Sequence, residues 1–407
     1  MNILILGLGG ITHAFRHWPE RTLGQALVKA GHTVRAITYH QPESPHLGLG
    51  ALHEVIDGIR VTRVKPRFWP NRALIQALEA EPLPDVVHIL HPRNVLAWAA
   101  VRWLRKRGVP IVWTWLGPFH DRWLVRDRER PYEETPRYEH LLYRWRDLLP
   151  QIVAERRVRE PIRNLLIHEP LRHVAAFIPC SQHEATVLAR MGFGSVPTTV
   201  IPLWLDLDFI AQLDTTAELP FTRPIIGYIG QLSLRKCYDL LVEAMPIIVA
   251  HHPNASFVFV THNEEQRALL QSMVSDRGLQ QHLHFLGTIS EEEKVALLRA
   301  CDVYAFPSRY EGFGLPPLEA MAIGTAVVST DIPVINETIQ HGENGLLAPY
   351  NDAAGLAAAL LDILDDDVLR QRLIAGGKHT IAQRYQPAVL VEQVLAIYQH
   401  VITLSGS

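Results

Sequence analysis

Cysteines and long apolar runs are scarce in this sequence, and both absences restrict what the protein can be. The three cysteines, Cys180, Cys237 and Cys301, are odd in number and far apart, which excludes a disulfide framework and a CxxC metal site. No apolar run reaches the roughly 18 residues that a membrane-spanning helix needs. The first eleven residues lack a basic segment and a cleavage site, which favours a core strand over a signal peptide. We therefore expect a cytoplasmic protein that does not cross a membrane.

The sequence also lacks a strong net charge, although its charges are unevenly distributed. The formal net charge is -3, with 48% hydrophobic and 20% charged residues, a composition that argues against disorder, a collagen-like repeat and a coiled coil. Residues 1–200 hold 27 lysines and arginines against 18 acidic residues, whereas the remaining residues hold 12 against 24. The basic first half indicates either an anionic partner, such as a phosphorylated substrate or a lipid headgroup surface, or solvated charge without a partner. We expect no nucleic-acid partner.

The length and the alternation of the sequence predict two α/β domains. A chain of 407 residues exceeds the roughly 250–300 residues at which single cores usually stop growing. Short apolar runs alternate with amphipathic segments in two series, which is the pattern of β-α units around a parallel sheet. The predicted strands are 2–6, 33–39, 59–64, 85–90, 110–115, 175–180 and 198–202 in the first series, and 224–229, 256–261, 282–286, 302–307, 326–330 and 345–349 in the second.

The domain boundaries follow from where the alternation breaks. We assign residues 1–205 to a first Rossmann-like domain, residues 206–222 to a linker without clear periodicity, and residues 223–385 to a second Rossmann-like domain. Ligands of open α/β sheets bind beyond the carboxyl ends of the strands, so the site is expected in a cleft between the two domains. The sequence leaves open on which domain the last predicted helix, 386–407, packs.

One segment, residues 120–173, does not fit the alternation. It lacks a strand signal, and between Arg122 and Arg172 it holds 12 arginines against 9 acidic residues, interleaved with tryptophans and tyrosines. One interpretation is an acceptor-binding or membrane-surface module, with arginines for phosphates and aromatic residues at the interface. The other is a pair of surface helices with arginine-carboxylate pairs, because the acidic residues are nearly as numerous.

The strongest chemical signal is the segment EGFGLPPLEAMAIGTAVVS at residues 311–329, which follows a predicted strand. Gly312 and Gly314 let the backbone approach a ligand, and the two prolines after them suit the first turn of a helix. Free amides at a helix N-terminus bind phosphate. Glu319 falls about one turn inside this helix, where its carboxylate can accept two ribose hydroxyls, and Glu311 precedes the glycines. The pattern predicts a nucleotide-sugar site, against a glycine-proline turn with two solvated glutamates.

This segment resembles the Glu-x7-Glu motif of the retaining GT-B glycosyltransferases of family 4. The likeness extends over the second domain and, more weakly, the first, and it implies an α/β fold of the GT-B class with two facing Rossmann-like domains. Residues 227–244, GYIGQLSLRKCYDLLVEA, are similar to the family's glycine-arginine turn and following lysine, whose cations bind the donor diphosphate. Lys236 matches the lysine. Gln231 stands at the arginine position, and Arg235 is the candidate that supplies the missing charge.

The resemblance implies a role for each matching residue. Glu319 binds the donor ribose, Glu311 contacts hydroxyls of the donor sugar, and Lys236 neutralises the leaving diphosphate. The phosphate is held by the backbone of the loop that opens the helix, and the base reaches the backbone of the loop after the FLG strand. These backbone contacts fall on Gly312, Phe313, Gly314 and Leu315 for the phosphate, and on Thr288 and Ile289 for the base.

In the first domain the resemblance is weaker. Residues 7–15, GLGGITHAF, are similar to the family's glycine loop, with Gly9 and Gly10 free to approach the diphosphate from the opposite domain. The exact GxGxxG spacing is absent, which disfavours a dinucleotide enzyme. The family histidine after the strand IVWTW is missing at its usual place. His120, followed by Asp121, is the candidate that substitutes for it, against a surface His-Asp pair.

We therefore predict a retaining glycosyltransferase that moves a sugar from a nucleoside-diphosphate-sugar to an acceptor hydroxyl in glycan, lipopolysaccharide or glycolipid synthesis. Its catalytic candidates are Glu311, Lys236 and His120. No metal and no further cofactor is expected, because cations hold the diphosphate. The acceptor is a sugar or a lipid-linked molecule, and a lipid-linked acceptor implies peripheral contact of the basic first half with the inner face of a membrane. The alternatives are a non-catalytic nucleotide-sugar-binding paralogue, indicated by Gln231, and a nucleotide-sugar epimerase or phosphorylase on the same fold.

Overall fold

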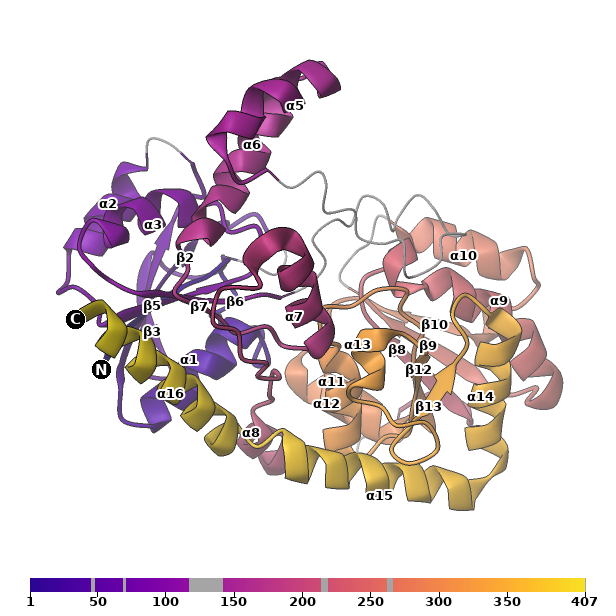
Figure 1. The fold of residues 1–407 in the computed structure, drawn as a ribbon. Coiled ribbons are helices and arrows are strands. Elements are labelled where there is room, and N and C mark those ends of the chain that lie inside the picture. The colour runs from indigo at the N-terminus through magenta and orange to yellow at the C-terminus, as the bar shows by residue number, and fades with distance from the viewer. Residues whose placement is uncertain (45–47, 69–70, 117–141, 214–218, 262–265, 407) are drawn as a thin grey trace. The chain divides into compact units, whose positions relative to one another are not determined.

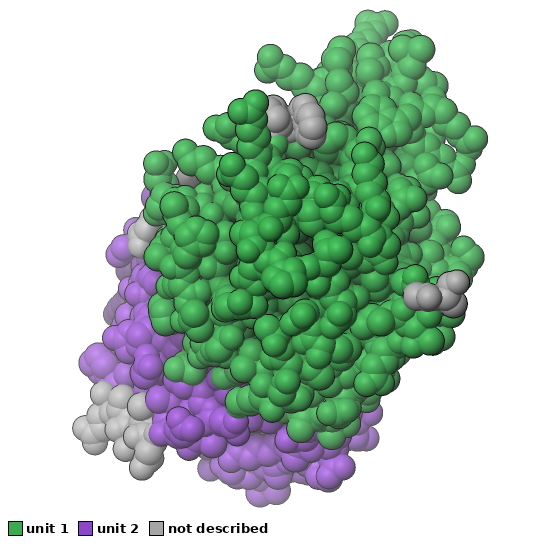
Figure 2. Space-filling view, turned by 90° about the vertical axis from the view of Figure 1, so that its left-hand side faces the viewer, with its two compact units in different colours: residues 1–117, 137–204, 387–407 green, residues 118–136, 205–386 purple. Residues whose placement is uncertain are grey.

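The computed structural model describes residues 1–44, 48–68, 71–116, 142–213, 219–261 and 266–406. Within these ranges the chain forms two compact units, each built around its own sheet (Figure 1). Unit 1 contains the elements up to Trp204 together with the C-terminal helix, and unit 2 contains the elements between Leu205 and Gln386 (Figure 2). The first unit is therefore assembled from both ends of the sequence.

Unit 1 is a seven-stranded sheet with helices on its faces. The strand order is β3-β4-β2-β1-β5-β6-β7, and all neighbours are parallel except β3 and β4. The strands are β1 (Asn2–Leu6), β2 (Thr33–Tyr39), β3 (His53–Ile56), β4 (Ile59–Val64), β5 (Val86–Leu90), β6 (Ile111–Thr114) and β7 (Ala176–Phe177). The helices and helical turns are α1 (Pro19–Lys29), α2 (Arg72–Glu79), α3 (Ala97–Arg105), η3 (Trp145–Asp147), α5 (Leu148–Glu155), α6 (Arg159–His168), η4 (Glu169–His173), α7 (Gln182–Leu188), η5 (Ala189–Phe193) and α16 (Pro387–Gly406).

Unit 2 is a six-stranded sheet in which every pair of neighbours is parallel, in the order β10-β9-β8-β11-β12-β13. The strands are β8 (Ile225–Ile229), β9 (Ser256–Val260), β10 (Leu283–Leu286), β11 (Val303–Phe306), β12 (Val327–Thr330) and β13 (Leu346–Ala348). The helices and turns are α8 (Leu207–Gln212), η6 (Leu234–Lys236), α9 (Tyr238–His251), α10 (Arg267–Ser275), η8 (Gln280–His282), α11 (Glu291–Ala300), α12 (Leu315–Ile323), α13 (Pro333–Asn336), α14 (Ala353–Asp365) and α15 (Asp367–Arg384).

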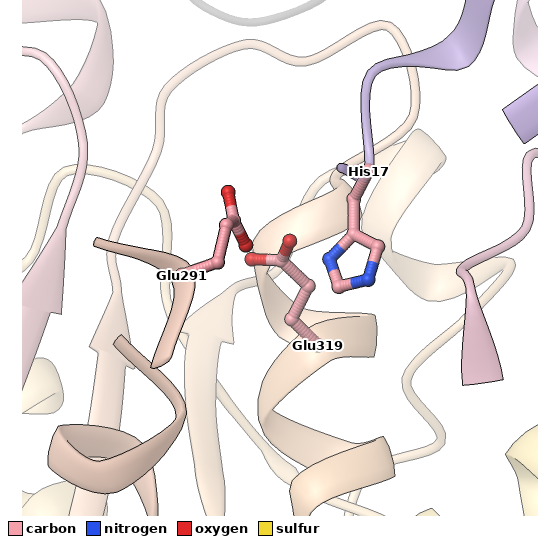
Figure 3. A group of neighbouring side chains, drawn as sticks. All are labelled: His17, Glu291 and Glu319. Atoms are coloured by element: carbon pink, nitrogen blue, oxygen red, sulfur yellow. The ribbon is translucent and has the colours of Figure 1, made fainter. Parts of the chain in front are cut away.

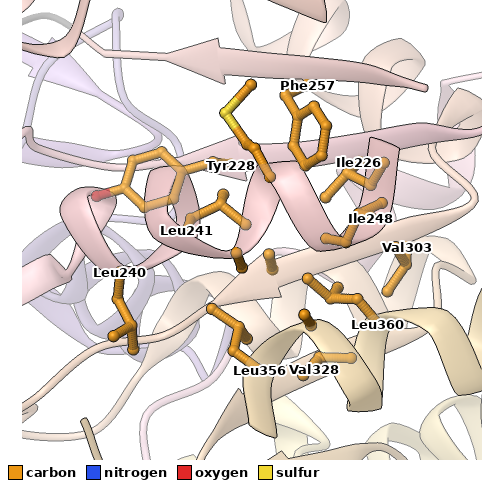
Figure 4. Packing of buried hydrophobic residues seen from close by; sticks show 14 of the residues in the cluster. Ile226, Tyr228, Leu240, Leu241, Ile248, Phe257, Val303, Val328, Leu356 and Leu360 are labelled. Carbon is orange, nitrogen blue, oxygen red and sulfur yellow. The ribbon is translucent and has the colours of Figure 1, made fainter. Parts of the chain in front are cut away.

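The core of unit 2 shows why its strands read as continuous apolar runs. Both faces of a parallel sheet are covered by helices, so successive residues on each strand are buried. Every residue of β9 and of β11 is buried. In Figure 4, Leu240, Leu241 and Ile248 of α9 pack beside the strand residues, with Leu356 and Leu360 of α14 nearby. Ser290 and Glu293 form a capping box at the start of α11.

Most predicted strands are confirmed to within two residues at each end. The strand predicted at 175–180 is shorter, since β7 spans only Ala176–Phe177, and two further differences concern residues 198–202 and β3. Residues 198–202 do not form a strand, since Thr198 makes only an isolated bridge to Phe177. The strand β3 was not predicted. It pairs with β4 through a tight turn at Asp57 and Gly58, both with positive φ. An Asp-Gly pair between apolar segments is a strong hairpin signal, and it is present in the sequence.

Two further segments were left undefined by the sequence. The stretch expected to be a linker contains α8, whose first turn is capped by Asp206 accepting a hydrogen bond from the Phe209 amide. The C-terminal helix α16 packs in unit 1, where its apolar side joins the core cluster.

The segment Asp367–Ser405 is long and apolar enough to cross a membrane by length and composition. It comprises two helices, α15 and α16, and the apolar side of α16 is buried in that core.

A buried hydrogen-bonded chain joins α16 to the sheet of unit 1. The Tyr398 hydroxyl lies 2.5 Å from Nδ1 of His88, and Nε2 of His88 lies 2.6 Å from the Thr114 hydroxyl. Burial lowers the pKa of His88 to about 3, so the ring is neutral at physiological pH. A neutral imidazole has one donor and one acceptor nitrogen, and both are used here, one toward the helix and one toward β6.

Candidate active site

Two loops at the carboxyl ends of adjacent strands form the centre of the candidate site in unit 2. One loop follows β8 and leads through η6 into α9, and the other follows β11 and leads into α12. The two loops are tied by a hydrogen bond of 2.8 Å from the Arg309 amide to the Arg235 carbonyl, and the Ser308 hydroxyl oxygen lies 3.1 Å from the same carbonyl. The buried Arg309 guanidinium also donates to the Leu234 carbonyl and reaches Asp239 at 3.4 Å. These contacts fix the position of η6 relative to the loop before α12.

The central contact is a buried ion pair between Lys236 and Glu311. The Lys236 ammonium lies 2.6 Å from Oε1 of Glu311, and both side chains are about nine-tenths buried. The same oxygen accepts a hydrogen bond of 2.5 Å from the Ser308 hydroxyl. Burial alone would raise the pKa of Glu311, but the charges of Lys236 and Arg235 hold this pKa below its usual value. The carboxylate is therefore ionised at neutral pH, and it offers its charge to a neighbouring cation.

Arg235 stands where a second cation was expected. Its Nη1 donates to the Tyr310 carbonyl at 2.9 Å and lies 3.4 Å from Oε1 of Glu311. Gln231, at the position of the family arginine, has an exposed side chain, and its carbonyl accepts from the Tyr228 hydroxyl at 2.9 Å. Of these two candidates, Arg235 is the one that the structure brings to Lys236 and Glu311.

The N-terminus of α12 is shaped by glycine and proline. Gly314 is the N-cap with φ +95°, and a Cβ there would lie 2.9 Å from Cδ1 of Ile335, so other residues would be strained. The amides at the start of an α-helix have no acceptor carbonyl within the helix. The amides of Gly314 and Leu315 therefore form no hydrogen bond inside α12. Phe313 is buried with its ring edge against Tyr385 at 6.2 Å. The buried Phe313 side chain thus anchors the loop, and the loop backbone lies at the N-terminus of α12.

A second charged cluster involves Glu319. The Lys294 ammonium of α11 lies 2.9 Å from Oε1 of Glu319 and 2.7 Å from Glu291. Figure 3 shows the carboxylates of Glu291 and Glu319 directed toward each other from α11 and α12. Burial alone would lower the pKa of Lys294, but the two carboxylates raise it above its usual value. Thr288 and Ile289 immediately precede α11, so the structure places the loop predicted to meet the base next to the helix that contacts Glu319.

Both predicted carboxylates lie within electrostatic range of one residue, Tyr304 of β11. Burial raises the pKa of the Tyr304 phenol, and the charges of Glu319 and Glu311 raise it further. The hydroxyl donates to the Ile229 carbonyl at the end of β8, at 3.1 Å. The Glu-x7-Glu spacing therefore places both carboxylates near the same strand, each in contact with its own lysine.

In unit 1, the glycine loop predicted to approach the diphosphate contacts a carboxylate of the same unit. The carboxylate of Glu20, on α1, accepts from the amides of Leu8, Gly9 and Gly10 at 2.5, 3.2 and 2.8 Å. Burial alone would raise the pKa of Glu20, but the neighbouring His91 ring and the amides of Leu8 and Gly10 lower it. A Cβ on Gly10 would overlap the Trp18 indole. The three amides of this loop therefore bind the Glu20 carboxylate. A contact of Gly9 and Gly10 with the donor remains a prediction.

The other unit 1 candidate, His120, lies outside the described residues. Among the described residues, a pocket of about 750 Å³ lies beside the carboxyl end of β4. Its lining includes the basic residues His40, Lys65, Arg67 and Arg72. No motif indicated this pocket, because its residues come from the ends of β2 and β4 and from α2.

Several residues at these sites were not found from the sequence. Lys294 follows three glutamates in the first turn of α11 and looks like part of a solvated charged face. Its contact with Glu319 joins residues 25 positions apart. Glu20 carried no motif. Only Arg309 could have been found among these three, because it follows the buried strand β11 closely. Residues in that position lie at the carboxyl edge of a parallel sheet, where ligands bind.

Two family models match the chain in succession. "Glycosyltransferase Family 4" matches residues 21–209, and "Glycosyl transferases group 1" matches residues 213–380. Phosphatidyl-myo-inositol mannosyltransferase of Mycobacterium leprae is 32% identical over 209 residues, which are 51% of this chain and 54% of that protein. Glycogen synthase of Mycobacterium tuberculosis is 28% identical over 230 residues, 56% of this chain and 55% of that protein. The matches thus span about half the length of these curated relatives.

Solved structures resemble the chain over nearly its whole length. Sucrose-phosphate synthase from Thermosynechococcus elongatus has a TM-score of 0.72 at 21% identity, covering 99% of both chains. Anabaena Alr3699/HepE, solved in complex with UDP, has a TM-score of 0.67 at 17% identity, covering 98% of this chain and 100% of that one. At these identities the likeness concerns the fold. Together with the two parallel-sheet units, it shows the predicted GT-B fold class.

Proposed function

The chain belongs to glycosyltransferase family 4, and from that membership we propose that it transfers a sugar from a nucleoside-diphosphate-sugar to an acceptor hydroxyl. The observation that carries the proposal is the pair of ionic clusters at the start of α12, Lys236 with Glu311 and Lys294 with Glu319. Each cluster holds a buried carboxylate in an ion pair with a lysine, close to the helix end. A carboxylate in that state can accept hydroxyl hydrogen bonds from a sugar or a ribose.

We assign the donor's parts to these residues. Glu319 binds the ribose, the amides of Gly314 and Leu315 bind the diphosphate at the helix N-terminus, and Glu311 binds hydroxyls of the donor sugar. Thr288 and Ile289 meet the base. Glu319 contacts Lys294, and Glu311 contacts Lys236. Donor binding therefore exchanges contacts inside each cluster instead of burying a new, unpaired charge, which would be costly.

In the proposed mechanism, Lys236 and Arg235 stabilise the negative charge that develops on the leaving diphosphate. The acceptor hydroxyl attacks the anomeric carbon from the face that the diphosphate leaves, so the configuration is retained. The acceptor proton passes to the departing phosphate oxygen. Because two cations neutralise the diphosphate, we propose that no metal ion is required. Turnover is then expected to persist in EDTA, and NMR of the product is expected to show the donor's anomeric configuration.

The acceptor is proposed to bind unit 1, in the basic pocket beside β4. Lys65 and Arg67 follow β4, where ligands of parallel sheets bind, and their charge suits an anionic acceptor. A relative named as a phosphatidyl-myo-inositol mannosyltransferase supports an acceptor linked to a phospholipid. Such an acceptor implies a cytoplasmic enzyme working at a membrane surface.

The test is turnover of UDP-, GDP- and ADP-sugars with soluble and lipid-linked acceptors, measured as release of the nucleoside diphosphate. Release that requires an acceptor, and that is lost in Lys236→Met, supports the proposal. Conversion of a sugar nucleotide without an acceptor would favour an epimerase instead. Tight nucleotide binding without turnover across the panel would favour the non-catalytic paralogue that Gln231 indicated.

A further inference from the structure

The helical hairpin formed by η3, α5 and α6 contacts other described residues of unit 1 through the segment before η3 and through α6. The Tyr143 hydroxyl donates to the Met191 carbonyl at 2.7 Å, and its ring packs on Phe193. In α6, Pro161, Leu165, Ile167 and His168 are buried. By contrast, α5 contributes no buried residue. Figure 1 shows α5 and α6 extending away from the sheet of unit 1.

The exposed part of the hairpin is apolar. Trp145, Leu149 and Val153 are 51, 70 and 69% exposed and lie four residues apart, a spacing that places side chains on one side of a helix. Val158 and Ile162, also four residues apart, are 56 and 37% exposed at the start of α6. Among the described residues, these five make up a large share of the large apolar side chains that unit 1 exposes. A helix whose apolar side is left uncovered within its own fold is typical of a docking surface.

The charges around these apolar residues have one predominant sign. Between Arg144 and Arg163 the hairpin holds six arginines, all exposed, against three acidic residues. Asp147 and Glu160 are engaged locally, with Arg146 at 3.6 Å and with Arg157 at 3.0 Å. Arginines beside exposed apolar residues and a tryptophan are the combination that binds an anionic lipid interface. The hairpin bears an excess of positive charge that a second copy of the same surface would repel.

We propose that this hairpin docks unit 1 on an anionic phospholipid bilayer. Trp145, Leu149 and Val153 insert at the level of the headgroups, and the arginines contact lipid phosphates. The surface is distinct from the donor-binding residues of unit 2, so docking and donor binding are separable. The proposal therefore stands or falls independently of the transfer reaction.

The test is co-sedimentation of the full chain with vesicles of phosphatidylcholine alone or with about 30% phosphatidylglycerol. The wild type is expected to bind the anionic vesicles and to lose binding in high salt, because exposed charges are screened. The double variant Leu149→Ser/Val153→Ser is expected to bind at least about tenfold more weakly. The matched control Val368→Ser removes an equally exposed apolar residue of unit 2 and is expected to bind like the wild type.

A second variant separates charge from apolar contact. Arg156→Glu/Arg157→Glu reverses two exposed charges and is expected to weaken binding to anionic vesicles by about tenfold or more. The serine double variant should keep the wild-type melting temperature because α5 buries no side chain, and the other variants should keep it because their substituted side chains are exposed. All variants should turn over a soluble acceptor normally. The proposal is overturned if the wild type does not bind anionic vesicles, or if the variants bind as well as it does. It is also overturned if sedimentation shows a dimer that the serine variants dissociate.

Discussion

Replacing Glu319 by alanine tests the proposed ribose contact without greatly destabilising the site. The substitution removes one of two carboxylates that contact Lys294, at 2.9 Å, and leaves Glu291 at 2.7 Å. Lys294 therefore keeps a counter-ion, and the large penalty for an unpaired buried charge does not arise. We expect the variant to fold and to lose donor affinity.

The size of this loss follows from the proposed bonds. A hydrogen bond to a charged group contributes about 1.5–3 kcal/mol. Two ribose hydroxyls on one carboxylate therefore contribute at least about 3 kcal/mol, which corresponds to a rise in Kd of at least about 100-fold. The matched control is Glu291→Ala, which removes the other carboxylate partner of Lys294 without removing a proposed ribose contact.

The assay is calorimetric titration of the wild type and both variants with UDP, GDP and ADP. The nucleotide that binds the wild type identifies the base. Glu319→Ala should then weaken binding by at least about 100-fold, and Glu291→Ala by much less. Equal losses in the two variants would refute the reasoning, since the effect would then come from Lys294. Unchanged affinity in Glu319→Ala would place the ribose elsewhere.

Three further predictions concern other contacts. Lys236→Met should lower kcat by about 100-fold or more at saturating donor, because it removes charge stabilisation of the leaving diphosphate; an unchanged kcat would contradict that role. Tyr398→Phe should destabilise unit 1 by about 1–3 kcal/mol in urea unfolding, since it leaves a ring nitrogen of His88 buried without a partner; a change near zero would argue against the bond. Because the folded-state pKa of Glu311 lies below the usual 4.5, its ionised form stabilises the fold above about pH 4.5, and this contribution is lost as the pH falls further. The melting temperature should therefore fall less steeply below about pH 4.5 in Glu311→Gln than in the wild type, and parallel curves would count against the pair.

The parallel sheets were predictable because their signal is local. Strands such as β1 and β2 are short apolar runs bounded by turns, and their bounds were predicted to the residue. The start of α12 was predictable for the same reason, since Gly314 and the prolines after it determine the backbone directly. In both cases the residues that cause the structure are adjacent in the sequence.

The partners of the site residues were not predictable, because they depend on tertiary contacts. Nothing near Lys294 indicates that it meets Glu319, and nothing near Gly10 indicates that Glu20 fills the cradle of amides. Sequence patterns predict which residues approach a ligand. They do not identify which other protein groups contact those residues.

Because α16 belongs to unit 1, unit 1 can complete its core only after the whole chain has been synthesised. The core of unit 1 includes Leu390, Val394 and Tyr398, which are synthesised only after all of unit 2. Until α16 is synthesised, the first 204 residues expose the apolar surface that α16 covers in the folded protein. Residues 205–386 can fold before that point. Expression of the first segment alone would leave that surface exposed to aggregation. A circularly permuted gene that begins at α16 would supply the missing helix first and should relieve this delay.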